Sequence, residues 1–294
     1  MPPPGDPSRA ERAAGIIHDI GYQRYDGPRL GRRSATRALY THSLRTAFGL
    51  GRSAKAKALP MGLLAAGAIA ALILVVVGSL IGEPVISPIG LVGSYTFGAT
   101  AFVAIVAPEL VSRDLRSHVL PLYLSRPLGT ADYARAKLAA LATAMFAVFA
   151  IPLVIMYLGT LLSSASGLSA AVGHTGDLAQ GLIAAVIHAA LLSAVALPLA
   201  SLSGRRVVAS GLVFGLFLLT APIAGILNEL GSGAVTTLSG LVDPVTLLNG
   251  VDRWLFGEGL TEVGEYGAVF GLTAISVTAA ATGLLLWRYW KVTA

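Results

Sequence analysis

The amino-acid sequence predicts an all-α integral membrane protein with six transmembrane helices. Of its 294 residues, 55% are hydrophobic and only 12% are charged, whereas soluble domains are about 25% charged. The apolar residues gather into six runs long enough to cross a bilayer, which takes about 18 residues or more. The predicted spans are residues 58–82, 87–111, 136–162, 178–202, 207–227 and 266–287. Residues 58–294 are therefore expected to form one transmembrane domain.

Residues 1–57 are expected to form a cytoplasmic arm ahead of the first span. The arm begins with "MPPPGDPSRAERAAG", a Pro- and Gly-rich stretch whose composition is typical of disorder. From about Ser34 to Leu50, apolar residues such as Leu39, Leu44 and Phe48 fall on about half of a helical wheel. This pattern predicts an amphipathic helix before the first span. It is either a basic arm held by anionic lipid or an elbow helix lying in the membrane interface.

The distribution of Lys and Arg predicts the orientation of the spans. Eleven of the 21 basic residues precede the first span and five lie between residues 113 and 137. The turn after the fourth span and the C-terminal tail hold two each, so twenty fall on one side. The other side carries only Arg253, together with eight acidic residues. Because basic loops stay in the cytoplasm, both termini are predicted to be cytoplasmic, and an even number of spans agrees. The positive charge is therefore attributed to membrane orientation, and no nucleic acid is expected as a partner.

Several kinds of chemistry lack their usual residues. The chain has no Cys, which excludes thiolate metal sites and a Cys nucleophile. It also has no GxxxxGK[ST] sequence to hold the phosphates of a nucleotide, so we expect no cofactor in this chain. No carboxylate lies near the middle of a predicted span, which argues against an ion-coupled carrier.

His188 lies near the middle of the fourth predicted span, within "LIAAVIHAALLSAVALPL". An ionisable group at that depth is costly, so it is a candidate intramembrane polar site. The alternative is a neutral histidine that forms hydrogen bonds within the helix bundle.

The connection between the second and third spans reads "ELVSRDLRSHVLPLYLSRPLGTADYARAK". Glu109 is expected to close the second span, with three charged residues in the next turn, and Thr130 to begin a new helix. Pro121 and Pro127 prevent one continuous helix across the connection. Between the prolines, "LPLYLSRP" carries more hydrophobic surface than a solvated loop needs. A short amphipathic element that docks into a groove of a partner protein would explain it.

This stretch resembles the corresponding segment of type-2 ABC-transporter permeases, and the resemblance extends along the whole six-helix chain. Residues 15–60 also look like the leader of actinobacterial members, which favours the elbow helix. The resemblance implies that the connection forms a coupling helix resting on an ATP-binding subunit. The ATPase-coupling residues that it implies are Glu109, Arg113, Asp114, Arg116, Leu122, Tyr123, Leu124 and Arg126.

The function implied by the resemblance is that of the permease subunit of an ATP-binding cassette exporter in the bacterial cytoplasmic membrane. The chain would not be an enzyme; a separate ATPase subunit, present in two copies, would bind ATP and Mg. A second permease copy, identical or related, and membrane lipid would be the other partners, and the cargo would be an amphiphile such as a lipid, drug or antibiotic.

Two alternatives stay open. The first is an ion-coupled carrier or channel, and the second is an integral membrane enzyme. An enzyme needs clustered polar groups. The acidic residues of the predicted outer loops form the only cluster, and the sequence offers no histidine to accompany them. These residues are Asp243, Asp252, Glu258 and Glu262.

Overall fold

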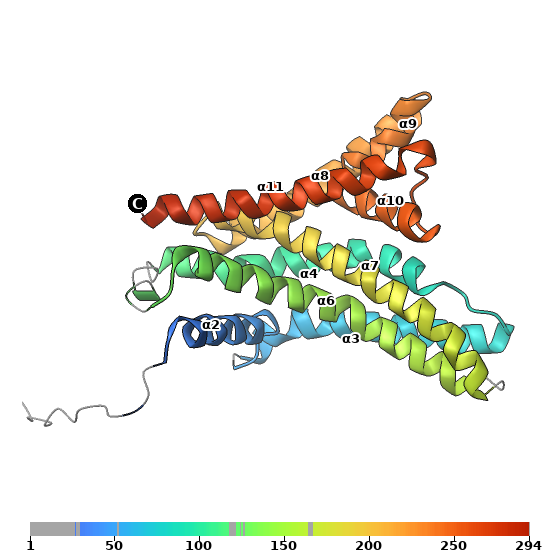
Figure 1. Ribbon diagram of the computed structural model, residues 1–294, viewed down its shortest axis with the longest axis horizontal. Coiled ribbons are helices and arrows are strands. Elements are labelled where there is room, and N and C mark those ends of the chain that lie inside the picture. The colour runs from blue at the N-terminus through green and yellow to red at the C-terminus, as the bar shows by residue number, and fades with distance from the viewer. Residues whose placement is uncertain are drawn as a thin grey trace, which may run out of the picture. The chain divides into compact units, whose positions relative to one another are not determined.

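Six long helices run back and forth along the molecule in the computed structural model (Figure 1). The structure describes residues 27, 30–51, 53–117, 122, 123, 125, 127–163 and 167–293. The described residues from Gly31 onward belong to one packed unit. Helices make up 86% of the structure, and the described residues contain no strand.

The six long helices are apolar enough to cross a membrane, which confirms the predicted number of spans. They are α3 (Ala54–Ile81), α4 (Pro88–Arg116), α6 (Thr130–Ser163), α7 (Gly167–Ser201), α8 (Arg206–Leu230) and α11 (Gly267–Thr293). Each contains one of the predicted apolar runs or nearly all of it. Length and composition of the runs were therefore sufficient to locate the six long helices.

Four of the helices, α4, α6, α7 and α11, extend by at least five residues beyond the predicted spans. The second span was predicted to end at Val111, but α4 continues to Arg116. The third span was predicted to begin at residue 136, and α6 begins at Thr130, where a helix start was predicted, with Asp132 in its first turn. The Asp132 carboxylate accepts a hydrogen bond from the Gly129 N–H at 3.1 Å, which ties the preceding backbone to the helix start. Charged residues thus remain helical at this end of the bundle.

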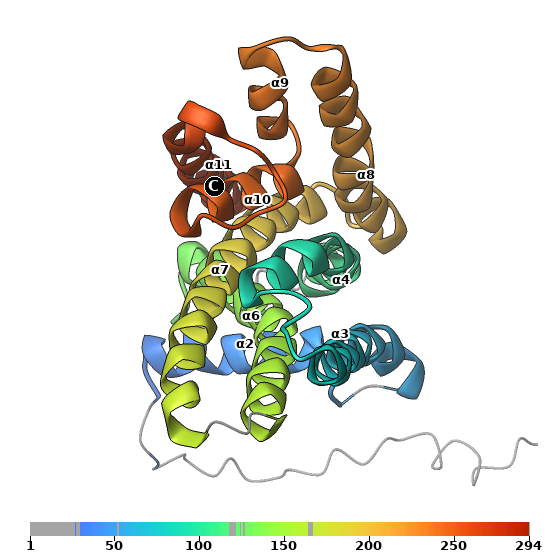
Figure 2. The ribbon, with the colours of Figure 1, turned by 90° about the vertical axis from the view of Figure 1, so that its right-hand side faces the viewer.

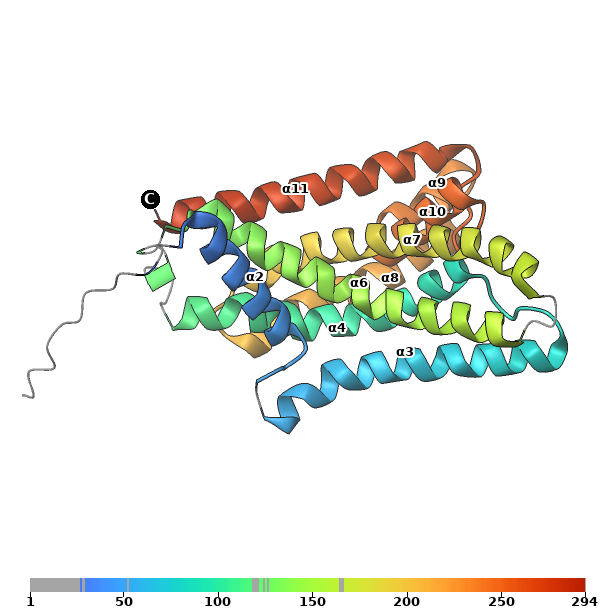
Figure 3. The same ribbon diagram turned by 60° about the horizontal axis from the view of Figure 1, so that its bottom comes forward.

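Consecutive long helices alternate in direction, so the connections gather at two opposite ends (Figures 1 and 3). We call one the basic end; there α4, α7 and α11 finish and α6 and α8 begin. At the other, the acidic end, α3, α6 and α8 finish and α4, α7 and α11 begin. Figure 2 faces the acidic end.

The core lies along α4, α6 and α7. In the most apolar stretch of α4 and of α7, 61% of the residues are buried, compared with 11% for α3 and 22% for α8 and for α11. α7 packs against α4, α6, α8, α10 and α11. The outer faces of α3 and α8 expose large aliphatic side chains, such as Ile73 and Leu80 on α3 and Leu219 and Ile226 on α8. Such faces suit contact with lipid or with another membrane helix.

Five shorter helices have both of their ends within the described residues. They are α2 (Arg32–Ala47), α9 (Ala234–Leu238), the 3₁₀ helix η1 (Ser239–Leu241), α10 (Pro244–Phe256) and the 3₁₀ helix η2 (Gly264–Tyr266). α2 overlaps the helix predicted from Ser34 to Leu50 and packs against α6 and α4. Figures 2 and 3 show that α2 crosses the long helices instead of running beside them.

The segment predicted to hold the coupling helix is described only in part. Residues 118–121, 124 and 126 lie outside the described residues, while Leu122 and Tyr123 are helical. The residues between α8 and α11, by contrast, are described throughout. The sequence was interpreted there as an outer loop, but its residues fold into α9, η1, α10 and η2.

Candidate functional site

A buried ion pair joins the last turn of α4 to the start of α6 at the basic end. Lys137 Nζ lies 2.8 Å from Asp114 Oδ2, and the Tyr133 hydroxyl donates to the same oxygen at 2.7 Å. The Lys137 side chain is 5% exposed and its ammonium lies over the Tyr133 ring. A buried charge that loses its partner is costly. The pair therefore favours one relative position of the two helix ends.

Tyr133 connects the segment between α4 and α6 to α11. Its ring centroid lies 5.7 Å from that of Tyr123 and 5.1 Å from that of Tyr289. Burial raises the pKa of the Tyr123 phenol, and the nearby Asp114 carboxylate acts in the same direction. Leu122, by contrast, is 69% exposed. The two neighbouring residues therefore face opposite ways: Tyr123 packs toward the bundle and Leu122 points outward.

Two further ion pairs bring α8 and α2 to the same end. Arg206, at the start of α8, pairs with Glu109 of α4, whose side chain is 9% exposed. Arg32 of α2 binds Asp132 of α6 through two nitrogens, Nε to Oδ2 at 2.5 Å and Nη2 to Oδ1 at 2.9 Å. The hydrogen bond with Asp132 raises the pKa of Arg32, so the guanidinium stays charged. Paired contacts of this kind fix orientation as well as distance.

A cavity of about 1050 Å³ opens beside these ion pairs, between the end of α4 and the turn from α7 to α8. Leu115, Arg116 and residues 202–208 line it, and Arg205 and Arg206 are among them. Arg116, Arg205 and Arg206 border this hollow; Arg206 is already paired with Glu109, and the other two leave an excess of positive charge there. Such a surface is complementary to an acidic surface of a partner.

The predicted coupling residues fall into three groups. Asp114 and Tyr123 meet around Tyr133, and Glu109 pairs with α8. Leu122 and Arg116 form the second group, which is exposed at the basic end. The third group consists of Leu124 and Arg126, which lie outside the described residues, and Arg113, whose backbone lies in α4 but whose side chain is not described.

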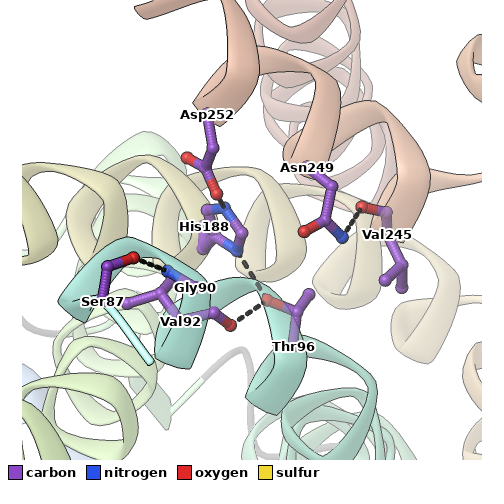
Figure 4. A network of polar contacts seen from close by, with 8 residues as sticks. All are labelled: Ser87, Gly90, Val92, Thr96, His188, Val245, Asn249 and Asp252. Atoms are coloured by element: carbon purple, nitrogen blue, oxygen red, sulfur yellow. Dashed lines mark hydrogen bonds and ion pairs between the residues drawn. The ribbon is translucent and has the colours of Figure 1, made fainter. Parts of the chain in front are cut away.

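A second polar cluster lies inside the bundle, around His188 of α7 (Figure 4). The Nδ1 atom of His188 lies 2.7 Å from Thr96 Oγ1 of α4, and its Nε2 lies 2.8 Å from Asp252 Oδ2 of α10. All three side chains are fully buried. Phe149 of α6 packs edge-on against the imidazole, with ring centroids 5.7 Å apart. Four helices therefore meet at this one ring.

The hydrogen bonds of Thr96 limit the protonation states of His188. The single hydroxyl proton of Thr96 has two acceptors within 2.7 Å, Val92 O and His188 Nδ1. If it goes to Val92 O, Nδ1 must itself donate. With an ionised Asp252 carboxylate facing Nε2, both ring nitrogens then carry protons. If it goes to Nδ1, a neutral ring with its proton on Nε2 fits equally well. The cluster thus allows two hydrogen-bonded arrangements that differ by one proton.

The cluster depends on how α10 is seated. Asp243 caps the helix, because its carboxylate accepts hydrogen bonds from the N–H groups of Val245 and Thr246 at 3.1 and 3.0 Å. Pro244, as the first helical residue, has no N–H that needs a partner. The Thr220 hydroxyl of α8 donates to the other Asp243 oxygen at 2.7 Å. One carboxylate therefore both starts α10 and fixes it to a long helix.

Glycines allow α10 to approach two of its neighbours closely. A Cβ atom on Gly250 would lie 2.2 Å from Phe270 Cδ1 of α11, and one on Gly93 of α4 would lie 2.4 Å from Asn249 Oδ1. Both distances are too short for any side chain larger than hydrogen.

The Oδ1 atoms of Asn249 and Asp252 are buried, and no hydrogen bond to either appears among the described residues.

The expectation that no histidine accompanies the outer acidic residues is wrong for Asp252. Its carboxylate binds His188, which is 64 residues away in the chain. The sequence does contain a signal for α10, since Asp243 followed by Pro244 is a typical helix start. It contains no local signal that this helix reaches a histidine of the fourth span.

The two clusters make different kinds of contact. The basic-end ion pairs link the ends of neighbouring helices by charge, whereas the His188 cluster links four helices by hydrogen bonds and ring packing inside the bundle. Among the described residues, no group of three His, Asp or Glu side chains is arranged to bind a metal ion. Comparisons with known protein families and with curated proteins find no match for this chain.

Proposed function

We propose that this chain is the permease subunit of an ATP-binding cassette exporter that moves an amphiphilic substrate across the bacterial cytoplasmic membrane. Two copies of a separate ATPase subunit, which bind ATP and Mg, would dock at the basic end. A second permease copy would complete the transporter. Both termini would then be cytoplasmic, α2 would be the interfacial elbow, and the segment between α4 and α6 would contain the coupling helix.

The observation that carries this proposal is the attachment of that segment to the helix bundle. Tyr123 packs on Tyr133, which is hydrogen-bonded to Asp114 at the end of α4 and contacts Tyr289 of α11. Leu122 stands exposed beside these contacts. A partner that pulls or pushes on Leu122 would therefore displace the ends of three long helices together. A solvated connector needs neither the exposed leucine nor the buried anchor.

In the proposed cycle, ATP binding closes the two ATPase subunits and moves the segment with them. The ion pairs Asp114–Lys137 and Glu109–Arg206 transmit this displacement to α4, α6 and α8. The two helix bundles then rock between inward-open and outward-open states. Hydrolysis and release of the ATPase subunits reset the transporter.

Purification of the tagged chain in mild detergent from its native host tests the proposal. A soluble ATPase with a Walker A sequence should be recovered with it, and ATP hydrolysis should depend on that subunit. The purified chain alone should hydrolyse no ATP. Hydrolysis by the isolated chain, or transport by the isolated chain in liposomes without ATPase, would contradict the proposal.

One observation favours a second candidate, an ion-coupled carrier. The sequence argued against a carrier because no span has a central carboxylate, but α10 brings Asp252 to His188 inside the bundle. Buried pairs of this kind can serve as proton relays. Transport in liposomes driven by a pH gradient without ATP, and lost in His188→Gln, would favour the carrier over the exporter.

A further inference from the structure

A cavity at the acidic end has the size of a small-molecule site. Its volume is about 760 Å³, and ligand sites commonly measure about 300–1000 Å³. It lies where the connection from α3 to α4 faces the end of α6 and the start of α7. This is the end of the bundle that faces the viewer in Figure 2.

One wall of the cavity is apolar. Leu74 and Val75 come from α3, Ile89 from α4, and Leu153 and Met156 from α6. Ile89 and Leu153 are buried in the core, so this wall belongs to the packed bundle and not to a loop. An apolar wall of this kind favours a hydrocarbon or aromatic group over water.

The charged groups of the cavity are almost all negative. Its lining includes Glu83, Asp177 and Glu258, all exposed, and the half-buried His174. No Lys or Arg is among the described residues that line it. The Ser87 hydroxyl donates to Glu258, which holds that carboxylate beside the start of α4 in the lining of the cavity. Three carboxylates beside an apolar wall make the cavity complementary to a molecule that is apolar at one end and positively charged at the other.

We propose that this cavity binds a cationic amphiphile, with its apolar part against α3 and α6 and its cation beside Glu83, Asp177 and Glu258. As an identification of the transported cargo, this rests on the proposed exporter function; as a binding site, it does not. A neutral lipid would fill the apolar wall without using the carboxylates. An anionic amphiphile of the same shape would be repelled by them.

Tetraphenylphosphonium and tetraphenylborate provide a test, because the two ions have nearly the same size and shape and opposite charge. Binding of each to the purified chain in phosphatidylcholine nanodiscs is measured by equilibrium dialysis. The cation should bind saturably and at least about tenfold more tightly than the anion. Glu83→Gln and Asp177→Asn should each weaken binding of the cation by up to about fivefold, the range for partly exposed charge pairs.

Glu262→Gln is the matched control. Glu262 is an exposed acid at the same end of the bundle, but it pairs with Arg253 and does not line the cavity. Leu74→Trp, which narrows the cavity from the α3 side, should weaken binding of the cation as well. Equal binding of the two ions would overturn the proposal, as would no saturable binding of the cation or unchanged binding in Glu83→Gln and Asp177→Asn.

The two proposals fail in different ways. Dialysis uses the chain without any ATPase, so a negative result leaves the exporter proposal intact. Conversely, if no ATPase is recovered with the chain but the chain still binds the cation more tightly than the anion, the binding-site proposal stands and the proposed role in ATP-driven export fails.

Discussion

Two pairs of ionisable side chains are buried in the described part of the bundle. Lys137 is paired with Asp114 at the basic end, and His188 with Asp252 in the interior. Removing two such charges together is often nearly neutral, whereas removing one leaves the other buried without compensation and costs about 3–5 kcal/mol. These pairs therefore specify which helices meet more than they add to overall stability.

The His188–Asp252 pair can be tested by a double-mutant cycle. His188→Leu leaves the buried Asp252 carboxylate without its hydrogen-bonded histidine partner and should lower the free energy of unfolding by about 3–5 kcal/mol. The double variant His188→Leu/Asp252→Leu should be more stable than His188→Leu alone. Denaturation in detergent, followed by circular dichroism, measures both. His174→Leu, a change of a partly exposed histidine in the same helix, is the control and should have little effect. If the losses of stability in His188→Leu and Asp252→Leu simply add up to the loss in the double variant, the contact contributes nothing.

The ion pair between Glu109 and Arg206 should matter for coupling more than for assembly. Glu109→Gln keeps the shape of the side chain but removes its charge, so the ATPase should still bind while transport per ATP hydrolysed falls about fivefold or more. The exchanged pair Glu109→Arg/Arg206→Glu should recover part of the loss. Reconstituted transport and hydrolysis rates, measured on the same preparation, give the ratio. An unchanged ratio in Glu109→Gln would exclude this role.

The long helices could be predicted from the sequence, whereas the His188 cluster could not. Each span is visible because its apolar composition is a local property of about 20 consecutive residues. The start of α2 and of α6 was also close to its predicted position, since amphipathic pattern and helix-start residues are local too. α10 was missed because its 13 residues are too short for a span and were assigned to an outer loop. Contacts of α10 with α7 join residues far apart in sequence, and no pattern within either segment predicts them.

The close approach of α10 to α11 can be tested with one methyl group. Gly250→Ala places a Cβ against the buried Phe270 ring, so it should lower the free energy of unfolding by about 1–3 kcal/mol. Gly225→Ala in α8 is the matched control: nothing lies within 4 Å of its added Cβ, and helix propensity should leave it neutral or slightly stabilising. Denaturation of the two variants under the same conditions compares them. Equal stability would mean that α10 packs less closely than described.

The segment between α4 and α6 provides a test of docking. If exposed Leu122 enters a groove of the ATPase, Leu122→Asp should weaken binding by about 2 kcal/mol or more, roughly thirtyfold. Ser125→Asp introduces the same charge at another exposed position and should have a smaller effect. The amount of ATPase recovered with the tagged chain, titrated against free ATPase, measures the difference. Equal recovery from the two variants would place the ATPase contact elsewhere.

The two ends of the bundle carry opposite charge. The basic end holds the ion pairs, the arginine-lined cavity and the exposed Leu122. The acidic end holds α10, the Ser87–Glu258 contact and the apolar cavity with its three carboxylates. The charge difference was evident from the sequence, because counting Lys and Arg needs only the order of the spans. The cavities were not, since each is formed by segments that the chain brings together from several helices.

Which end of the bundle faces the cytoplasm can be tested directly, because the chain contains no Cys and a single introduced Cys can be labelled. Ser232 lies exposed in the turn between α8 and α9 at the acidic end, and Ser125 lies exposed between α4 and α6 at the basic end. Since twenty of the 21 basic residues fall on the Ser125 side, that side should be cytoplasmic. In intact cells, an impermeant maleimide should therefore label Ser232→Cys but not Ser125→Cys, which should react only after permeabilisation. The unaltered chain has no thiol to label and provides the background. Labelling of Ser125→Cys alone from outside would reverse the orientation and place the proposed ATPase-docking surface on the wrong side of the membrane, and labelling of both would contradict a six-span topology.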